Sequence, residues 1–251
     1  MAFYRSILLT GASSGLGEAL LQPLLKKTKK LTVIGRKNPG IPGIDFLKAD
    51  LSNPEAVENL RSKLDPKIDL FISCAGQGTT GLTEEIPADA FQRAMNINFF
   101  SVVQLTQMLL PRMKKNGGTL LFVTSGVATR GLPFTAPYSA AKAALNNFSE
   151  SLRTELDPYP VDVLLFSPGP IASRFHENRQ HFGKGVLESP KFHGAPPEKV
   201  AAALIKALSM KKPRTTLGFK ARLAEHLKYW VPRVTDKIVA WQYRLNRASD
   251  T

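Results

Sequence analysis

The sequence predicts a doubly wound α/β fold, in which helices cover both faces of a parallel sheet. Short apolar segments alternate along the chain with segments whose apolar residues recur every three or four positions. The short segments are apolar almost without interruption, which is typical of strands buried on both faces. The alternation of the two patterns is typical of consecutive β–α units. A chain of 251 residues is long enough to form one such domain.

Seven segments are predicted to be strands and four to be helices. In chain order, the strands are "SILLT" (6–10), "LTVIG" (31–35), "DFLKADL" (45–51), "IDLFISCAG" (68–76), "TLLFVTSG" (119–126), "VDVLLFSPG" (161–169) and "RTTLGF" (214–219). Helical spacing covers residues 16–25, 57–64, 99–113 and 140–156. We therefore expect a sheet of about seven strands in a single domain over residues 1–218. A helical C-terminal extension over 219–251 is expected to follow it.

Glycine and serine follow several of the predicted strands, as in "TGASSGLG" (10–17), "SCAGQG" (73–78) and "SPGP" (167–170). Right-handed crossovers place the carboxyl ends of parallel strands at one edge of the sheet, and ligands bind beyond that edge. The segment over about 174–197 is long for a loop and contains several phenylalanines. We expect it to form a substrate loop, and its composition favours an apolar carbonyl compound or alcohol.

Three glycines, Gly11, Gly15 and Gly17, lie where the first predicted strand meets the first predicted helix. Their missing side chains allow positive φ and the close approach of a phosphate to the backbone. The helix begins near Leu16, and its N-terminal N–H groups favour a pyrophosphate. A simple helix cap is the alternative explanation, but the position at the first strand–helix junction favours a dinucleotide.

The end of the second predicted strand bears on the choice of dinucleotide. It reads Gly35, Arg36 and Lys37, without the acid that would accept the ribose 2′-hydroxyl of NAD. Arg36 can instead make a bidentate, charge-assisted contact with a 2′-phosphate. Ser13 and Ser14 are candidates for further hydrogen bonds to that phosphate. The sequence therefore predicts that NADP(H) is preferred over NAD(H).

Tyr138 and Lys142 lie four residues apart near the start of an alanine-rich helix that Pro137 introduces. This spacing stacks the two side chains on one helical face. The pKa of a free phenol is about 10, so proton transfer near neutral pH requires a lower pKa, and a neighbouring ammonium can supply that effect. An exposed Tyr and Lys on an ordinary helix is the alternative that this spacing alone leaves open.

From residue 6 to about residue 207, the chain resembles the short-chain dehydrogenase/reductases, a family with a Rossmann fold. "TGASSGLG" is similar to the family's TGxxxGxG cofactor turn, "SCAG" (73–76) to its NNAG segment and "SPGPIAS" (167–173) to its PG motif. Tyr138 and Lys142 match its YxxxK motif. These motifs occur in the family's order.

Three single residues extend the resemblance. Asp50 in "ADLS" matches the acid that contacts adenine, and Asn98 in "NINFF" matches the active-site asparagine. Ser125, thirteen residues before Tyr138, matches the substrate-binding serine. The cofactor-binding residues that the resemblance implies, together with those named above, are Gly11, Ser13, Ser14, Gly15, Leu16, Gly17, Arg36, Lys37, Asp50, Leu51, Ala75, Gly76, Tyr138, Lys142, Pro168, Gly169, Ile171 and Ser173.

The resemblance implies an oxidoreductase that transfers a hydride between a nicotinamide and a carbonyl compound or secondary alcohol. Tyr138 would be the general acid or base, and Lys142 would lower its pKa and hold the nicotinamide ribose. Ser125 would hydrogen-bond the developing alkoxide, and Asn98 would bind a water that links Lys142 to solvent. No metal is expected. The alternative function is an NADPH-binding regulatory protein or a membrane-surface adaptor with little turnover.

The chain departs from the family pattern at Ser73 and Cys74, which replace the two asparagines of NNAG. We expect this change to affect local stability and adenosine contacts more than the chemistry. Cys74 is the single cysteine, so it can form no disulfide within the chain and is expected to be a small core residue.

The net charge of +14 is concentrated near the C-terminus, where residues 211–251 contain ten Lys and Arg against three Asp and Glu. Apolar residues recur there at steps of three or four: Leu223, Leu227, Trp230, Val234, Ile238, Trp241 and Leu245. The favoured interpretation is a pair of short helices that pack on the core or on another subunit. An amphipathic element that lies on anionic lipid is the alternative. Nucleic-acid binding is not expected, because no recognition motif accompanies the charge.

No apolar segment approaches the roughly 20 residues that cross a bilayer. With a single cysteine, the chain is expected to be cytoplasmic, with peripheral contact at a membrane surface as an option. The resemblance and the apolar or small faces of 99–113 and 140–152 predict a homodimer or homotetramer that acts on a small-molecule substrate.

Overall fold

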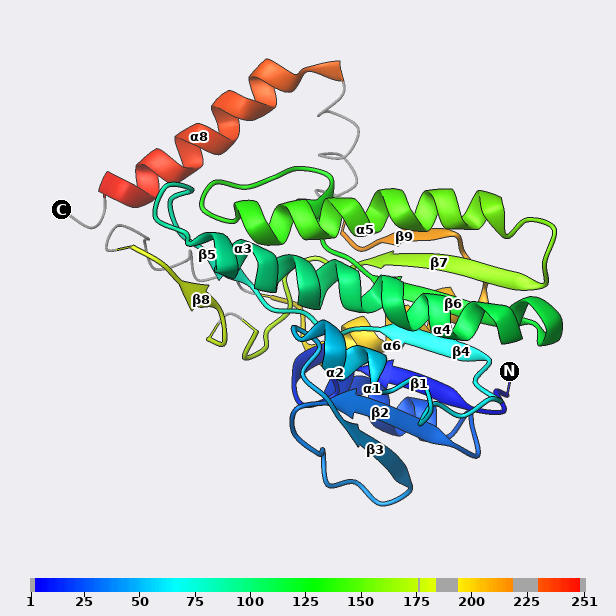
Figure 1. Ribbon diagram of the computed structural model, residues 1–251. Helices are drawn as coiled ribbons and strands as arrows, with labels where there is room; N and C mark the ends of the chain where they lie inside the picture. The colour runs from blue at the N-terminus through cyan, green and yellow to red at the C-terminus, as the bar shows by residue number, and fades with distance from the viewer. Residues whose placement is uncertain (1–2, 176, 184–193, 219–229, 249–251) are drawn as a thin grey trace.

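The computed structural model describes residues 3–175, 177–183, 194–218 and 230–248, the last seven of them by their backbone alone. Seven strands form one parallel sheet (Figure 1). Their order across the sheet is β3 (Ile44–Lys48), β2 (Leu31–Gly35), β1 (Ile7–Thr10), β4 (Leu70–Ser73), β6 (Gly118–Val123), β7 (Val161–Ser167) and β9 (Arg214–Thr216). The predicted doubly wound fold and its seven strands are therefore confirmed.

The direction of chain progression across the sheet reverses beside β1. The chain passes from β1 through β2 to β3 on one side, and then from β4 through β6 and β7 to β9 on the other. Ile7 of β1 is accordingly paired both with Leu31 of β2 and with Leu70 of β4. In open α/β sheets, ligands bind beyond the carboxyl ends of the strands at such a reversal. The topology thus places the expected site next to the carboxyl end of β1.

Helices cover both faces of the sheet (Figure 1). Their bounds are α1 (Gly15–Leu25), α2 (Pro54–Glu58), α3 (Ala88–Met95), a π-helix (Asn96–Phe100), α4 (Ser101–Asn116), a 3₁₀ turn (Gly126–Ala128), α5 (Ala136–Glu155), α6 (Pro197–Ser209) and α8 (Pro232–Ala248). The prediction did not identify α3, the π-helix or α6 as separate elements.

Alternate residues of each strand face two separate cores. Ile7 and Leu9 of β1 pack with α1 and α6, whereas Leu8 packs with α4 and α5 on the opposite face. All three side chains are fully buried. This burial on both faces explains why the strands are apolar without alternation.

The helix predicted over 57–64 is shorter and begins earlier than expected. The Asn53 side chain accepts hydrogen bonds from the N–H groups of Glu55 and Ala56, which fixes the start of α2 at Pro54. Beyond Glu58 the chain continues through turns, and Leu60 and Leu64 are buried in the core from those turns. Their apolar spacing therefore reflects burial without a continuous helix.

A second, two-stranded sheet connects segments that are far apart in the sequence. β5 (Thr79–Thr80) pairs in parallel with β8 (Gln180–His181). The Gln180 N–H donates to the Gly78 carbonyl at 3.0 Å, and the Phe182 N–H donates to the Thr80 carbonyl at 2.9 Å. The first part of the predicted substrate loop is thereby fixed against the segment that follows β4. The later part, residues 184–193, lies outside the described residues.

The C-terminal extension contains a helix that stands apart from the sheet layers, α8 (Figure 1). The Arg130 guanidinium hydrogen-bonds the Thr235 hydroxyl at 3.4 Å and forms an ion pair with Asp236. Leu223 and Leu227, two members of the predicted apolar stripe, lie outside the described residues. None of the helices described is long and apolar enough to cross a bilayer.

Phe122→Ala is expected to lower the free energy of unfolding by about 3–5 kcal/mol, because it leaves a cavity in the core. Phe122 is fully buried, and its ring centre lies 6.4 Å from that of Phe71 and 6.0 Å from that of Phe148. Urea unfolding followed by circular dichroism measures the change. The matched control is Phe3→Ala, at a side chain that is 60% exposed, which is expected to change stability by less than about 0.5 kcal/mol. Equal effects of the two changes would contradict the core assignment.

Candidate active site

The glycine turn after β1 is packed tightly against the chain that follows β4. Gly11 has a φ of +76°, and a Cβ built on it would lie 2.5 Å from Ala75 Cα. A Cβ on Gly17 would collide with the carbonyl oxygen of Gly11. Any side chain at either position would push the helix and the turn apart. Gly11 and Gly17 are therefore required by contacts within the protein as well as by any ligand.

The N-terminus of α1 is open to an anion. Its N-cap residue, Ser14, has extended backbone geometry, and no side chain among the described residues caps the helix. The Ser173 side chain, from beyond β7, lies against Gly15, where a Cβ would be 2.9 Å from Ser173 Cβ. Free N–H groups at a helix start, beside a glycine turn, form a cradle that fits a pyrophosphate. Leu16 is buried beneath this cradle, and Ser13 is exposed beside it.

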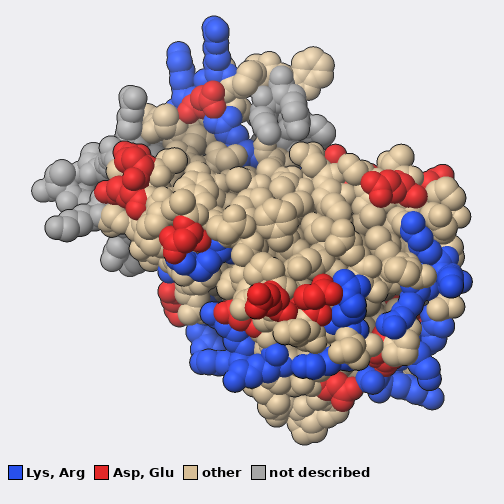
Figure 2. Space-filling model, in the orientation of Figure 1, with Lys and Arg blue, Asp and Glu red and all other residues tan. Residues whose placement is uncertain are grey.

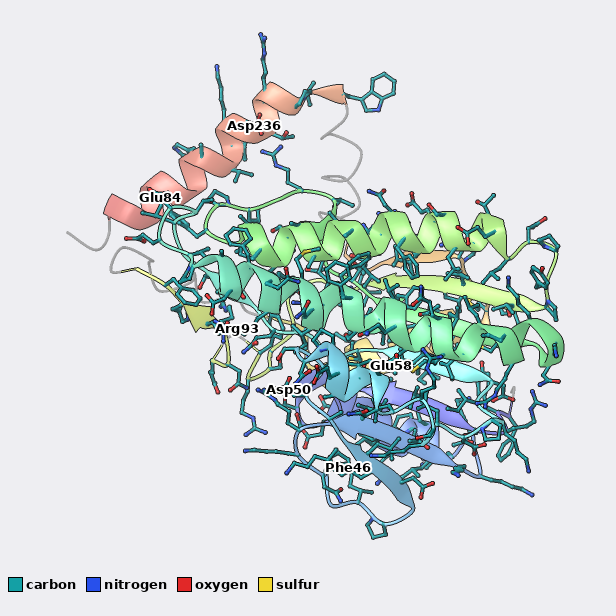
Figure 3. All side chains as sticks on the ribbon, in the orientation of Figure 1. Phe46, Asp50, Glu58, Glu84, Arg93 and Asp236 are labelled. Carbon is teal, nitrogen blue, oxygen red and sulfur yellow. The ribbon has the colours of Figure 1, made fainter. Side chains whose placement is uncertain are left out.

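The ends of β2 and β3 present polar groups near the same edge of the sheet. Arg36 and Lys37 follow β2 directly, and both are exposed. Asp50 follows β3 and lies near the start of α2 (Figure 3). One Asp50 carboxylate oxygen accepts hydrogen bonds from the N–H group and the hydroxyl of Ser52, at 2.9 and 2.8 Å. This fixes the carboxylate at the surface, while the neighbouring Leu51 is buried in the core.

The segment that replaces NNAG is held by Thr10. The Thr10 hydroxyl oxygen accepts hydrogen bonds from the N–H groups of Cys74 and Ala75, both at 3.1 Å. Ser73 is buried, and burial raises the pKa of the Cys74 thiol to about 12. The thiol is therefore protonated near neutral pH, and Cys74 is half-buried against the core instead of within it. Because Thr10 binds the backbone here, the loss of the two asparagine side chains leaves the segment in place.

Asn98 lies in the π-helix and is fully buried. Its amide nitrogen donates to the carbonyls of Gln77 and Ala94 at 3.0 and 2.9 Å, and its amide oxygen accepts from the Gln77 N–H at 3.2 Å. A Cβ on Gly76 would lie 2.8 Å from that oxygen. The resemblance implied a water on Asn98, but backbone groups occupy its side chain. Asn98 therefore joins the segment after β4 to the helix before α4.

Lys142 extends from α5 into the interior. Its Nζ donates a hydrogen bond to the Val123 carbonyl at 3.0 Å and lies 6.0 Å from the centre of the Tyr138 ring. A Cβ on Gly76 would be 3.7 Å from the same nitrogen. Burial lowers the pKa of Lys142 to about 8. The ammonium is thus retained at neutral pH, within the space between β6, the Gly76 segment and Tyr138.

Tyr138 differs from the expectation that its pKa is lowered by Lys142. Burial raises the pKa of Tyr138 to about 12, while a hydrogen bond from Ser125 and the charge of Arg179 act in the opposite direction. The loss of hydration of the phenolate therefore outweighs the stabilising groups around it. Tyr138 is protonated near neutral pH in this state of the protein.

Ser125 lies two residues after the end of β6, in the loop that leads to α5. Its hydroxyl oxygen accepts the Val127 N–H at 3.5 Å. Phe134, near the end of that loop, has a φ of +64°, an uncommon conformation for a bulky residue. Its carbonyl accepts the Gly81 N–H at 2.9 Å, which joins the loop to the segment that carries β5. The loop is thereby held near both of its ends, before α5 and Tyr138 begin.

Sequence reasoning missed Arg179, which lies in the segment after β7. Its side-chain carbons lie over Gly78, where a Cβ would be 2.8 Å from Arg179 Cδ. In the same segment, the Phe175 ring lies 5.6 Å from the Tyr138 ring. Phe175 belongs to the predicted substrate loop, but no local pattern indicated Arg179. Only the pairing of β5 with β8 brings it to the site.

The PG segment completes this edge of the sheet. Pro168 and Gly169 follow β7 directly. Ile171 forms an isolated β-bridge with Ala195, and the Ala172 N–H donates to the Ala195 carbonyl at 3.0 Å. These bonds fix the segment that brings Ser173 against the glycine turn. Among the described residues, no three His, Cys, Asp or Glu side chains gather as metal ligands would.

Comparison with known proteins gives consistent matches in sequence. The family described as short chain dehydrogenase matches residues 5–182. A 3-ketodihydrosphingosine reductase from Bacteroides thetaiotaomicron is 31% identical over 250 residues, which cover 90% of this chain and 93% of the relative. Estradiol 17-beta-dehydrogenase 2 from Mus musculus is 33% identical over 212 residues, which cover 74% of this chain and 56% of that protein.

A solved structure is similar in fold. A short chain dehydrogenase from Burkholderia cenocepacia, in complex with NADP, has a TM-score of 0.80 and 26% sequence identity. The similarity covers 95% of this chain and 99% of that one.

Lys142 is expected to make the stability of the cofactor-free protein depend on pH. Its folded pKa, about 8, is below the value of about 10.4 for an unfolded chain, so the unfolded state binds more protons between these values. The free energy of unfolding, relative to that of Lys142→Met, should therefore rise by about 2 kcal/mol from pH 8 to pH 10. Urea unfolding at several pH values measures this difference.

Below pH 8, Lys142 is largely protonated in both the folded and the unfolded state. The difference in the free energy of unfolding between wild type and Lys142→Met is therefore expected to be nearly constant there. Exposed Lys67 provides the control, since Lys67→Met should leave the pH dependence of the wild type unchanged. If the free energies of unfolding of the wild type and of Lys142→Met change in parallel from pH 8 to pH 10, the lowered pKa of a buried Lys142 is contradicted.

Proposed function

Because the chain belongs to the short-chain dehydrogenase family, we propose that it is an oxidoreductase that transfers a hydride between NADP(H) and an apolar carbonyl compound or secondary alcohol. The observation that carries the proposal is the position of Tyr138, with Ser125 and Lys142 around its ring, at the edge of the sheet where the glycine turn lies. The cofactor supplies the hydride, and the protein supplies geometry, a proton and stabilisation of charge.

In this proposal, Tyr138 is the general acid or base. A phenol with a pKa of about 12 is protonated near neutral pH and can donate its proton to a carbonyl oxygen. In the oxidative direction the same group, as the phenolate, accepts the proton of the alcohol. The Ser125 hydroxyl, which hydrogen-bonds the phenol, can also donate to the oxygen on which negative charge develops.

Lys142 serves two purposes in the proposed site. Its ammonium is fixed by the Val123 carbonyl, and its remaining protons are available to ribose hydroxyls. The same positive charge favours the phenolate that forms when Tyr138 releases its proton. Asn98 acts as a positioning residue, because its three hydrogen bonds fix Gln77 and Ala94 beside Gly76.

Residues at the turn and at the ends of β2, β3, β4 and β7 would hold the cofactor. The free N-terminus of α1 suits the pyrophosphate, and exposed Arg36 and Lys37 suit a 2′-phosphate. In this proposal, Asp50, which hydrogen-bonds Ser52, contacts the adenosine, and Ile171 and Ser173 contact the nicotinamide carboxamide. The fold neighbour in complex with NADP is consistent with this choice of dinucleotide.

An apolar substrate is supported by the residue over Tyr138. The Phe175 ring covers the phenol at 5.6 Å and presents an apolar wall. Two relatives are named for 3-ketodihydrosphingosine and for estradiol, which are largely apolar compounds with a keto or hydroxyl group. Homo-oligomerisation through α4 and α5 also belongs to the proposal, since Phe100 exposes 41% of its surface before α4.

Tyr138→Phe is expected to lower the rate of NADPH oxidation at least about 100-fold with a panel of ketones and aldehydes of increasing chain length, because it removes the proton donor. Absorbance at the NADPH band measures the rate, and fluorescence titration measures cofactor affinity, which should be nearly unchanged. The control is Tyr159→Phe, the same change at an exposed tyrosine. Turnover that survives Tyr138→Phe would refute the assignment.

Arg36→Gln is expected to weaken NADPH binding by about 10- to 100-fold, since a hydrogen bond to a charged group contributes about 1.5–3 kcal/mol. NADH lacks the 2′-phosphate, so its affinity should change little. Titration of both cofactors measures the ratio. Arg112→Gln, at an exposed arginine of α4, is the control and should affect neither. Equal weakening of both cofactors by Arg36→Gln would remove Arg36 from the 2′-phosphate site.

A further inference from the structure

The outer side of α8 carries large apolar side chains in contact with solvent. Trp230 is 84% exposed, Trp241 is 61% exposed, and Val234 and Ile238 are each at least half exposed. Val234, Ile238 and Trp241 recur at steps of three or four, so they form one stripe along the helix, and Trp230 lies two residues before its start. A water-soluble surface rarely retains a stripe of this kind unless something covers it.

The orientation of α8 follows from its contacts with the body. Among the α8 side chains that the structure describes, Thr235 and Val239 are half-buried. Thr235 and Asp236 bind Arg130, and Figure 3 labels Asp236 on the helix. On a helix with 100° between residues, the position of Trp241 lies on the side opposite to this contact, whereas Trp230 precedes the helix. The apolar stripe therefore extends from the flank of the helix to its outward side.

Basic side chains share the outward side. Arg233 and Lys237 are exposed, and their helical positions lie beside that of Trp241. Figure 2 shows Lys and Arg side chains that project from the region where Figure 1 draws α8. Residues 211–251 carry ten Lys and Arg against three Asp and Glu, so the whole extension is strongly basic. The partner must therefore accept apolar groups and offer negative charge.

We propose that α8 binds the surface of a lipid bilayer that contains anionic headgroups, with Trp230, Trp241, Val234 and Ile238 in the interfacial layer and Arg233 and Lys237 against the headgroups. Tryptophan and long basic side chains are the residues that such an interface favours. Each Lys or Arg near an anionic surface adds to binding. The helix lies along the surface and does not span it.

Two other partners fit less well. A second copy docked through the same face would bring a second basic extension, with ten Lys and Arg against three Asp and Glu over residues 211–251, and like charges across an interface oppose association. A nucleic acid would satisfy the charge but would leave two tryptophans and two branched aliphatic side chains without an apolar environment. An anionic bilayer satisfies both features.

The position of α8 connects this surface with the site. Arg130, which holds the helix, belongs to the loop between Ser125 and Tyr138. The same loop is bound to Gly81 through the Phe134 carbonyl. A bilayer bound along α8 would therefore lie beside the loop that joins Ser125 to α5, the helix that carries Tyr138. If the proposed function holds, an apolar substrate can reach the site from the membrane surface.

The experiment uses the full chain and its intrinsic fluorescence. The chain has two tryptophans, and both lie on the proposed surface. Emission is recorded during titration with vesicles of phosphatidylcholine, with and without phosphatidylglycerol, and flotation separates bound protein. We expect a blue shift and flotation with the anionic vesicles, and neither with phosphatidylcholine alone. Vesicle binding is measured without turnover, so it stands or fails independently of the proposed function.

Arg233→Gln/Lys237→Gln should weaken binding to the anionic vesicles by about 30-fold, since each charge near the surface contributes about 1 kcal/mol. The matched control, Lys26→Gln/Lys29→Gln, removes the same charge from exposed positions at the end of α1 and should have little effect. Trp230→Ser should also reduce binding, because it removes the most exposed apolar group.

Three results would overturn the proposal. Equal losses in the two double variants would show attraction by overall charge without a defined surface. Flotation without a blue shift would show that the tryptophans stay in water. A blue shift that grows with protein concentration in the absence of vesicles, together with a dimer in sedimentation, would show that a second copy covers α8.

Discussion

The hydrogen bond between the Lys142 ammonium and the Val123 carbonyl is the interaction on which the site depends. A buried ammonium is costly unless it is bound, and this carbonyl is a backbone group of β6, so its position is set by the sheet. Burial lowers the pKa of Lys142 to about 8, which is close to the range where the charge would be lost. The same burial raises the pKa of Tyr138. Near neutral pH, Lys142 therefore carries its positive charge and Tyr138 carries its proton. Tyr138 can donate that proton when a carbonyl is reduced.

The rest of the site is arranged by the reversal of strand order beside β1. This reversal brings the glycine turn, the Ala75 segment and Ser173 together, although they lie more than 50 residues apart in the sequence. Close packing then accounts for the glycines, since a methyl group on Gly11 would collide with Ala75. Asn98 and Thr10 bind the backbone of the segment after β4 from two sides. The segments beyond these strand ends are therefore held by contacts within the protein itself.

The outer parts of the proposed site are held by contacts between segments that are far apart in the sequence. β5 and β8 hold the start of the substrate loop, which positions Phe175 over Tyr138 and Arg179 over Gly78. Arg130 binds α8 from the loop on the other side. Oxidoreductase chemistry and membrane recognition would then share one end of the molecule, with the chemistry inside the sheet edge and the lipid contact outside it.

The sequence by itself determined the seven strands, the glycine turn and the shared helical face of Tyr138 and Lys142, because each depends on periodicity or spacing within one short segment. It also indicated the amphipathic stripe of α8. Only the tertiary structure decided the rest. The predicted extent of the helix over 57–64 was wrong because Leu60 and Leu64 are buried in the core from turns that follow α2. The positions of Arg179 and of the Asn98 amide, and the raised pKa of Tyr138, depend on burial and on partners distant in the chain. Local patterns carry no information on such partners, since desolvation and packing arise only when separate segments meet.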